Sequence, residues 1–287
     1  MKLIHTIAGL QTVLAQEKGA KKSIGFVPTM GALHPGHIEL VKRAVAGNDV
    51  SVVSIFVNPN QFNNPDDLLN YPRTLAADCE RLEAAAADIA FVPEVEEIYP
   101  EPDRRRFHFG SLETVMEGRF RPGHFNGVAQ VVSRLFDIVK PDRAYFGEKD
   151  FQQLAIVRAL VEQLALGIEI VACPIVREEG GLAMSSRNAR LTATQRERAA
   201  CIFKTLSESD ALRGSLSVRA LEQWVVSRIN AVAGLEVEYF DIVDGCTLQP
   251  LNGWADTNCP VGCIAVYAGD VRLIDNIVYG KNPVSIF

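Results

Sequence analysis

Apolar and polar positions follow two different rhythms along the first 175 residues. Short apolar runs bounded by Gly, Pro or polar turns predict strands at residues 23–28, 49–59, 89–93, 143–150 and 168–174. Apolar residues at helical spacing, or strong helix formers, predict helices at residues 73–88, 127–141 and 150–167, the last capped by Asp150 and ended by Gly167. Strands that alternate with helices form a parallel sheet covered on both faces, so the pattern predicts an α/β, Rossmann-like domain.

The pattern changes after Pro174. Residues 176–191 are polar and contain glycine, which predicts a loop. Thr192 and Gln195 have the spacing of a capping box and begin a helix to about residue 206, and a second helix is predicted at 217–233. Strand-like runs follow at 235–244, 261–269 and 271–280. We therefore expect a Rossmann-like domain at 1–175 and a smaller α+β domain at 176–287 that closes over the active site.

Composition and charge restrict the classes of partner. The chain has 287 residues, of which 48% are hydrophobic and 22% charged, and its net charge is −6. These values are typical of a soluble globular protein and argue against a nucleic acid as the main partner. No apolar run approaches the ~20 residues that cross a bilayer, and polar residues interrupt the N-terminal segment, so we expect neither a membrane span nor a signal peptide. The six cysteines are scattered and indicate free thiols in a reducing cytoplasm.

The stretch "PTMGALHPGHIEL" (residues 28–40) lies where a predicted strand leads into a helix. A helix N-terminus offers unpaired N–H groups and a partial positive charge, and Gly36 would let a ligand approach the backbone. His34 and His37 could donate ring N–H groups to phosphate oxygens. Two other interpretations stay open here: a metal site, for which no third ligand is evident, and plain capping or packing. The chain contains neither a P-loop nor G-x-G-x-x-G.

Two further segments add donors to the same predicted sheet edge. "AMSSRN" (183–188) offers two hydroxyls and a guanidinium, although alone it could be a turn, and "FGEKD" (146–150) places Lys149 at a strand-to-helix turn, although Lys149 could simply be exposed. Ligands of open parallel sheets bind at the carboxyl ends of the strands. The three segments together, without a P-loop, favour a site that opens the α-phosphate of ATP.

Six blocks of the sequence, in order, carry a resemblance to a known family. They are "PTMGALHPGH", "SIFVNPNQF", "YPRTLAADCE", "RPGHFNGV", "PDRAYFGEKDFQQL" and "GLAMSSRN". The H-x-G-H pattern with a later serine-rich basic loop resembles the adenylate-forming nucleotidyltransferase superfamily, and the six blocks resemble the pantoate–β-alanine ligases (pantothenate synthetases). Asn60 departs from the family block V-N-P-M-Q-F, where Met stands. The segment "EPDRRRFHF" (101–109) aligns with none of the blocks and is interpreted as a solvated loop.

The resemblance implies an enzyme that condenses (R)-pantoate with β-alanine through a pantoyl adenylate, releasing AMP and pyrophosphate. It implies ATP as substrate, Mg²⁺ as cofactor with unidentified protein ligands, a homodimer and a cytoplasmic location. The catalytic residues implied are His37, His34 and Lys149, with His37 at the position of a proton donor, and Gln61 and Gln153 would bind pantoate. The ATP-binding residues implied are Met30, Gly31, Ala32, Leu33, His34, Pro35, Gly36, His37, Gly147, Glu148, Lys149, Asp150, Val176, Met184, Ser185, Ser186 and Arg187.

Two alternative functions remain at this stage. A nucleotidylyltransferase that moves AMP onto a phosphate-bearing substrate would keep the histidines, but it would have no need of two glutamines at the acid site. A nucleotide-binding regulatory module would bind ATP without releasing AMP. The residues alone do not exclude either.

Overall fold

The computed structural model describes residues 1–62 and 65–280, which form two compact units. The first unit consists of Met1–Phe109, Arg121–Glu148 and Gln153–Cys173. The second consists of Gly110–Phe120, Lys149–Gln152 and the described residues from Pro174 onward. The sequence predicts a single division between residues 175 and 176. Two short inner segments of the predicted first domain pack with the second unit instead.

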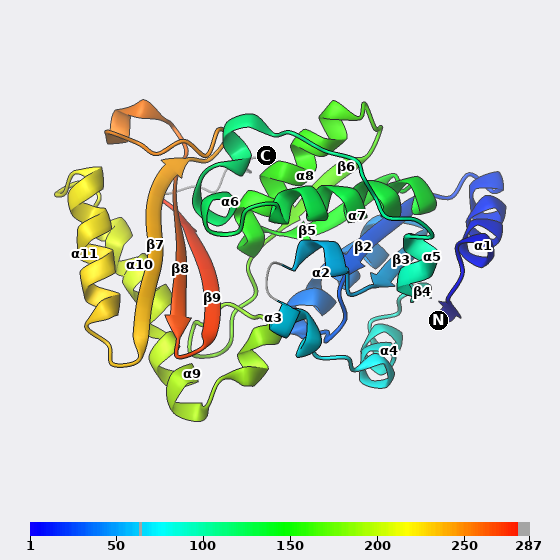
Figure 1. The fold of residues 1–287 in the computed structure, drawn as a ribbon, viewed down its shortest axis with the longest axis horizontal. Helices are drawn as coiled ribbons and strands as arrows, with labels where there is room; N and C mark the ends of the chain where they lie inside the picture. The colour runs from blue at the N-terminus through cyan, green and yellow to red at the C-terminus, as the bar shows by residue number, and fades with distance from the viewer. Residues whose placement is uncertain (63–64, 281–287) are drawn as a thin grey trace. The chain divides into compact units, whose positions relative to one another are not determined.

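The first unit is built on a six-stranded parallel sheet with the order β1-β4-β3-β2-β5-β6 (Figure 1). Its strands are β1 (Lys2–Ile4), β2 (Ile24–Thr29), β3 (Val50–Ile55), β4 (Ile89–Phe91), β5 (Arg143–Gly147) and β6 (Glu169–Cys173). The predicted α/β fold is therefore confirmed. All six residues of β3 are buried, including Ser51 and Ser54, because a central parallel strand is covered on both faces.

Helices cover both faces of this sheet. The helices and helical turns of this unit are α1 (Ile7–Gly19), α2 (Pro35–Gly47), η1 (Pro59–Gln61), α3 (Pro65–Leu69), α4 (Leu75–Ala84), α5 (Val95–Ile98), α7 (His124–Val139), and η3 (Glu148–Asp150) and α8 (Phe151–Gln163) except for their residues 149–152, which belong to the second unit. Phe26 of β2 contacts Phe136 of α7, whereas its neighbour Val27 packs with Val41 of α2. Because successive strand residues point to opposite faces, α7 and α2 lie on opposite sides of the sheet.

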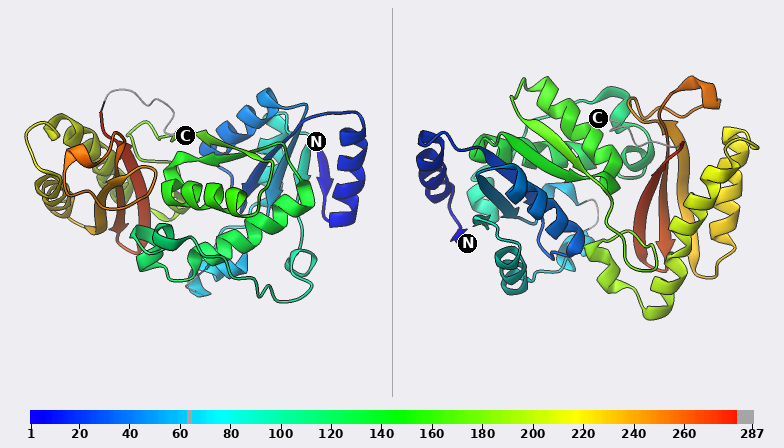
Figure 2. Two further views of the ribbon diagram at one scale, coloured as in Figure 1. Left: turned by 90° about the horizontal axis from the view of Figure 1, so that it is seen from above. Right: turned by 180° about the vertical axis from the view of Figure 1, so that it is seen from behind.

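The second unit contains a three-stranded antiparallel sheet, β7-β8-β9, covered on one face by helices (Figure 2). Its elements are η2 (Gly110–Glu113), α6 (Met116–Phe120), η4 (Ser186–Arg190), α9 (Ala193–Ala199), α10 (Cys201–Leu212), α11 (Val218–Asn230), β7 (Leu235–Asp244), η5 (Trp254–Asp256), β8 (Pro260–Ala268) and β9 (Val271–Val278). Buried side chains of α10 and α11 form one core with Phe240 and Leu273 of the sheet. The α+β character predicted for this region is confirmed.

The other face of the small sheet holds the inner segment Gly110–Phe120. Glu117 is 8% exposed and forms a two-pronged ion pair with Arg272 of β9, at 2.6 and 2.9 Å. Tyr239 of β7 donates to the same carboxylate at 2.8 Å and stacks on Phe120. The carboxylate therefore has partners on two strands, and α6 is fixed to the sheet although its sequence neighbours belong to the first unit.

Local signals predicted some boundaries well. The capping box of α9 forms as expected, with Thr192 Oγ1 accepting from the Gln195 N–H at 3.2 Å and Gln195 Oε1 accepting from the Thr192 N–H at 2.9 Å. The predicted end of α8 is wrong. The helix ends at Gln163, and Ala165 takes a left-handed φ of 49°, so Gly167 is not needed to stop it. In residues 1–62 and 65–280 no helix is long and apolar enough to cross a membrane.

Candidate functional site

The loop after β2 is held by a buried carboxylate. Asp78 of α4 is completely buried and accepts backbone N–H groups from Ala32 at 2.9 Å and Leu33 at 2.8 Å. The loop needs this support because Ala32 has a φ of 48°, a conformation that residues other than glycine rarely adopt. At Gly31, with φ 78°, a Cβ would lie 3.1 Å from Asp78 Oδ2 and 3.0 Å from the Ile55 side chain. The loop from Met30 to His34 therefore has one defined shape.

The two histidines cap α2 in a reciprocal way. His34 Nδ1 accepts from the Gly36 N–H at 3.2 Å, and His37 Nδ1 accepts from the His34 N–H at 3.4 Å. The rings lie 3.9 Å apart between centroids, at 31°. An Nδ1 that accepts carries no proton in neutral imidazole, so the proton is on Nε2. The capping interpretation of the sequence is thus part of the structure.

The turn that carries Gln61 is arranged by a buried asparagine that the sequence reasoning missed. Asn58 is 1% exposed, and its Oδ1 accepts from the Tyr99 hydroxyl at 3.0 Å and the Asn60 N–H at 3.3 Å. Its Nδ2 therefore faces Gln61 Oε1 at 3.2 Å. Burial raises the pKa of Tyr99, which keeps the phenol protonated as a donor. Gln61 Nε2 in turn donates to the Met30 sulfur at 2.8 Å, so the structure brings these two predicted site residues together.

Lys149 lies in η3, between β5 and α8. Its ammonium is 3.4 Å from Asp150 Oδ2 and its side chain is only 18% exposed, so the simple picture of an exposed lysine does not hold. Its backbone carbonyl accepts from Asn276 Nδ2 of β9 at 3.1 Å. Burial raises the pKa of the neighbouring Glu148, and the positive charge of Arg158 opposes that rise. Lys149 is therefore positioned by a strand of the second unit.

Residues 176–184, within the loop predicted at 176–191, fold back on themselves as a hairpin closed by one β-bridge. The Met184 N–H donates to the Val176 carbonyl at 2.9 Å, and Arg177 pairs with Ala183. The guanidinium of Arg177 makes two bonds to Asp275 of β9, at 2.6 and 2.9 Å, and lies 3.7 Å from the centre of the Phe203 ring. Burial raises the pKa of Asp275, and Arg177 opposes that rise. The hairpin that joins Val176 to Met184 is thereby anchored to the small sheet.

The serine-rich loop after the hairpin ends in the turn η4. Ser185 Oγ accepts from the Arg187 N–H at 3.2 Å. Asn188, which is 3% exposed, donates to Glu178 Oε1 at 2.9 Å and to the Ala183 carbonyl at 3.0 Å. Asn188 therefore ties the loop that carries the two hydroxyls and the guanidinium back to the hairpin.

The two adjacent glutamines of the "FQQL" block have different surroundings. Gln152 is 4% exposed, and its Nε2 donates to the carbonyls of Leu112 at 2.7 Å and Val115 at 2.9 Å, while its Oε1 accepts from the Glu117 N–H at 2.9 Å. All three of these hydrogen bonds hold the backbone of residues 112–117 against the start of α8. Gln153 is half-buried and is the member of the pair that the family resemblance assigns to pantoate.

The predicted site residues are divided between the two units. Met30 to His37, Gln61, Gly147, Glu148 and Gln153 belong to the first, and Lys149, Asp150, Val176 and Met184 to Arg187 to the second. Sequence reasoning missed the residues that support them, chiefly Asp78, Asn58, Asp275 and Asn276. Asp78 and Asn58 do occur within quoted blocks, where a polar residue amid apolar neighbours was the available signal.

Metal ligands were one alternative for the histidine pair. Among the residues that the structure describes, no group of three or more His, Cys, Asp or Glu side chains could hold a metal ion. His34 and His37 use their Nδ1 atoms for capping, as described above.

Comparison with known proteins gives one consistent result. The family model described as "Pantoate-beta-alanine ligase" matches residues 2–278. The chain is 60% identical over 282 residues to "Pantothenate synthetase" of Bacteroides fragilis, which covers 98% of this chain and 100% of that protein. It is 49% identical over 277 residues to the protein of the same name from Cytophaga hutchinsonii, which covers 96% of this chain and 98% of that protein.

Solved structures agree with the sequence comparison. Pantothenate synthetase from Thermus thermophilus has a TM-score of 0.91 and 43% identity, covering 98% of this chain and 100% of that one. Pantoate-beta-alanine ligase from Francisella tularensis, complexed with "Beta-gamma ATP and Beta-alanine", has a TM-score of 0.84 and 37% identity, and each chain is covered to 99%.

Proposed function

Because the chain belongs to the pantoate–β-alanine ligase family, we propose that it condenses (R)-pantoate with β-alanine at the expense of ATP. The match across residues 2–278, together with 60% identity to a named pantothenate synthetase, is the observation that carries this conclusion. The products are pantothenate, AMP and pyrophosphate, and the intermediate is pantoyl adenylate. No observation favours the nucleotidylyltransferase or the regulatory module over this function.

The proposed ATP-binding segments come from both units. His34 and His37 would direct their Nε2–H groups to phosphate oxygens at the start of α2, within the binding segment Met30–His37. Such preorganised donors stabilise the charge that develops on phosphate, each by ~3 kcal/mol. Lys149, with its neighbours from Gly147 to Asp150, and the loop Met184–Arg187 would contact the phosphates, and Val176 would meet the adenine through its backbone. The relative from Francisella tularensis, complexed with "Beta-gamma ATP", supports nucleotide binding by this fold.

The proposed pantoate site uses the amides of Gln61 and Gln153. Pantoate presents a carboxylate and two hydroxyls, and an amide offers both donors and an acceptor for them. Gln61 Oε1 already accepts from Asn58, whereas its Nε2 donates to the Met30 sulfur, a weak acceptor. An oxygen of pantoate would be a better acceptor than this sulfur, so the amide is oriented to receive the acid.

The reaction then proceeds in two steps. A carboxylate oxygen of pantoate attacks the α-phosphorus, and the bond from that phosphorus to the bridging oxygen breaks and releases pyrophosphate. The neutral amine of β-alanine next attacks the activated carbonyl, loses a proton, and expels AMP as the carbon–oxygen bond of the mixed anhydride breaks. Positioning and charge neutralisation are the protein's main contributions to the first step.

Exclusion of water protects the mixed anhydride, and we propose that the C-terminal domain closes over the active site to supply it. Gly180 and Gly181 are candidate hinges for such a movement. They lie at the tip of the hairpin, whose base is held by the pair of Arg177 and Asp275, so bending at the glycines would move the tip alone. Any larger movement would carry the hairpin together with β9.

The remaining proposals concern cofactor, assembly and location. Mg²⁺ would be bound chiefly by ATP oxygens and water, where it neutralises phosphate charge. We also propose a homodimer in the cytoplasm, without a nucleic-acid or membrane partner. Light scattering tests the assembly: a particle of twice the chain's 31.5 kDa is expected, and a monomer at micromolar concentration would contradict it.

Pyrophosphate exchange tests the function directly. The protein is incubated with ATP, Mg²⁺ and labelled pyrophosphate, with and without pantoate. We expect label to enter ATP only when pantoate is present, because the adenylate must form before it can reverse. Exchange that needs a phosphate-bearing acceptor instead would indicate a nucleotidylyltransferase. Binding of ATP without exchange under any condition would indicate a regulatory module.

A further inference from the structure

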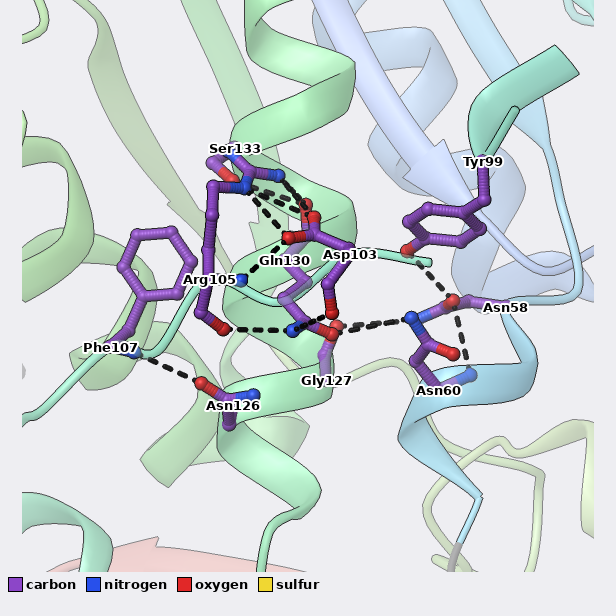
Figure 3. A network of polar contacts seen from close by, with 10 residues as sticks. All are labelled: Asn58, Asn60, Tyr99, Asp103, Arg105, Phe107, Asn126, Gly127, Gln130 and Ser133. Atoms are coloured by element: carbon purple, nitrogen blue, oxygen red, sulfur yellow. Dashed lines mark hydrogen bonds and ion pairs between the residues drawn. The ribbon is translucent and has the colours of Figure 1, made fainter. Parts of the chain in front are cut away.

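Two sequence features remain outside the proposed mechanism: Asn60, which stands where the family block has Met, and the arginine-containing segment at 101–109. The structure joins them in one polar network (Figure 3). The three arginines of the segment are exposed, as expected for a solvated loop. Phe107 and Phe109, however, are each only 8% exposed, and Arg105 bonds to α7 of the same unit. The segment is thus mostly solvated as expected, and the two phenylalanines are the exceptions.

Gln130 of α7 is the centre of this network and is 6% exposed. Its Nε2 donates to the backbone carbonyls of Asp103 at 3.0 Å and Arg105 at 2.9 Å. Because both amide hydrogens are used there, its Oε1 must face the other way, toward Asn60 Nδ2 at 3.2 Å. The Asn60 amide is thereby met by an acceptor of fixed direction.

The segment 103–107, which accepts both hydrogen bonds from the Gln130 amide, is held by further contacts. Arg105 binds Asp103 through two bonds, Nε to Oδ1 at 3.0 Å and Nη2 to Oδ2 at 2.6 Å, and its Nη2 also donates to the Gln130 carbonyl at 3.1 Å. The Phe107 N–H donates to Asn126 Oδ1 of α7 at 3.0 Å. The segment is therefore hydrogen-bonded to α7, the helix that carries Gln130, through both the Arg105 side chain and the Phe107 backbone.

The other end of the network reaches the turn η1, in which Asn60 directly precedes Gln61. The turn lies on α7 with no space between them: a Cβ at Gly127 would be 2.2 Å from the Asn60 carbonyl oxygen and 2.9 Å from Gln61 Cα. His124 of α7 also contacts the Gln61 carbonyl through Nδ1, at 2.9 Å. A shift of Asn60 against α7 would therefore displace Gln61.

We propose that Asn60 and Gln130 are positioning residues for Gln61, which set the orientation of its amide toward pantoate. This inference rests on the proposed function, in which Gln61 binds pantoate. A methionine at position 60 would fill space through a flexible, non-directional side chain. The amides of Asn60 and Gln130 supply a directional hydrogen bond instead. The ion pair of Asp103 and Arg105 holds the segment that fixes the Gln130 amide, and so limits movement of the turn η1 against α7.

Steady-state kinetics of pantothenate formation test this role in the whole enzyme. Asn60→Met, Gln130→Met and the double variant are compared with Gln16→Met, a matched change at an exposed position of α1. We expect the KM for pantoate to rise about fivefold in each single variant, as loss of one neutral hydrogen bond implies. The KM values for ATP and β-alanine should stay within about twofold, and Gln16→Met should match the wild type.

The double variant separates coupling from general damage. If the two amides act as one contact, removing both should raise the KM for pantoate no further than removing one. Gln130→Met also leaves two carbonyls without their donor and could weaken folding, so thermal unfolding is measured in parallel. Asn60 is exposed, and its variant keeps the test valid if Gln130→Met fails to fold.

Three results would overturn the inference. An unchanged KM for pantoate in both single variants would show that the contact does not position Gln61. An equal rise in the KM values for all three substrates would indicate only a structural defect. A wild-type protein that makes no pantothenate from pantoate, β-alanine and ATP would instead refute the proposed function, and the inference with it.

Discussion

The side-chain amide of Asn276 donates to the backbone carbonyl of Lys149 across 3.1 Å, although the two residues are 127 positions apart in the sequence. Its neighbour Asp275 points to the opposite face of β9 and holds Arg177, next to Val176. Two consecutive residues of one strand therefore support two different segments of the proposed ATP site. Neither residue belongs to the blocks that revealed the family.

Asn276→Ala should weaken the use of ATP. With the amide removed, the η3 turn loses a fixed contact at Lys149, and we expect kcat/KM for ATP to fall by about tenfold, near the upper end for one neutral hydrogen bond. Steady-state kinetics with ATP varied measures the effect. Asn252→Ala, at an exposed position of the same unit, is the control and should leave kcat/KM for ATP unchanged. A normal kcat/KM for ATP in Asn276→Ala would contradict the positioning role.

His37→Ala should fold yet lose most adenylation. The ring contributes one capping contact, worth about 1 kcal/mol, and one proposed donor to phosphate, worth roughly 100-fold in rate. Pantoate-dependent pyrophosphate exchange measures the rate, and circular dichroism confirms the fold. His5→Ala, which removes an exposed histidine that contacts the Val92 carbonyl, serves as control. Near-normal exchange in His37→Ala would refute the charge-stabilising role.

Asp78→Asn should reduce both stability and ATP affinity. An asparagine can accept at only one of the two carboxylate positions, so either the Ala32 or the Leu33 N–H would face an amide N–H₂ group. We expect a loss of about 2 kcal/mol in the free energy of unfolding, measured in urea, and a higher KM for ATP. Glu80→Gln, on the exposed face of α4, provides a matched change. Equal stability of the two variants would be inconsistent with Asp78 holding the loop.

Glu222→Gln should stabilise the second unit at neutral pH. Burial is the main reason why the pKa of Glu222 is raised, with the negative charge of Asp241 adding to it. A raised folded-state pKa means that ionisation opposes folding above that pKa. The amide retains an acceptor for the Ile242 N–H, bound at 2.9 Å, without the charge. We expect the melting temperature at pH 7 to rise by about 2 °C and the gain to vanish below the ordinary pKa of 4.5. A gain that persists at pH 4 would point to another cause.

ATP should protect the segment 177–190 from trypsin, because the proposed phosphate contacts lie in it. Arg187 and Arg190 are the cleavage positions to follow by mass spectrometry, with and without ATP, Mg²⁺ and pantoate. We expect slower cleavage there in the presence of ligands and no change at the exposed Arg104. Equal sensitivity at 177–190 in both conditions would remove the support for closure of this segment.

Sequence patterns predicted the elements whose causes are local. The valine-rich strand β3 and the capping box of Thr192 and Gln195 depend on neighbouring residues. The capping box formed as expected, and the strand formed over Val50–Ile55 of the predicted 49–59. The end of α8 did not, because the chain turns at Ala165 through bonds from Ala165 to Glu162 and from Leu166 to Val161. An alanine in a left-handed conformation has no signature in the sequence.

The site was predictable only in part for the same reason. His34, Gln61 and Lys149 stand in blocks that identify the family, so their roles followed from resemblance. The contacts that support them join residues far apart, such as Asp78 to Leu33 and Asn276 to Lys149. A buried asparagine and an exposed one look alike in a sequence, and only the fold shows which of them meets a carbonyl.

Glu117, which forms an ion pair with Arg272, and Gln152, whose amide is buried, belong to inner segments of the chain that pack with the second unit. No single break in the chain therefore separates the two units. A fragment ending at residue 175 would carry the Phe120 ring and the Glu117 carboxylate without the strands that cover them. Such a fragment should aggregate or stay partly unfolded. A chimera made from two relatives therefore has to take residues 110–120 and 149–152 from the same parent as the C-terminal sheet.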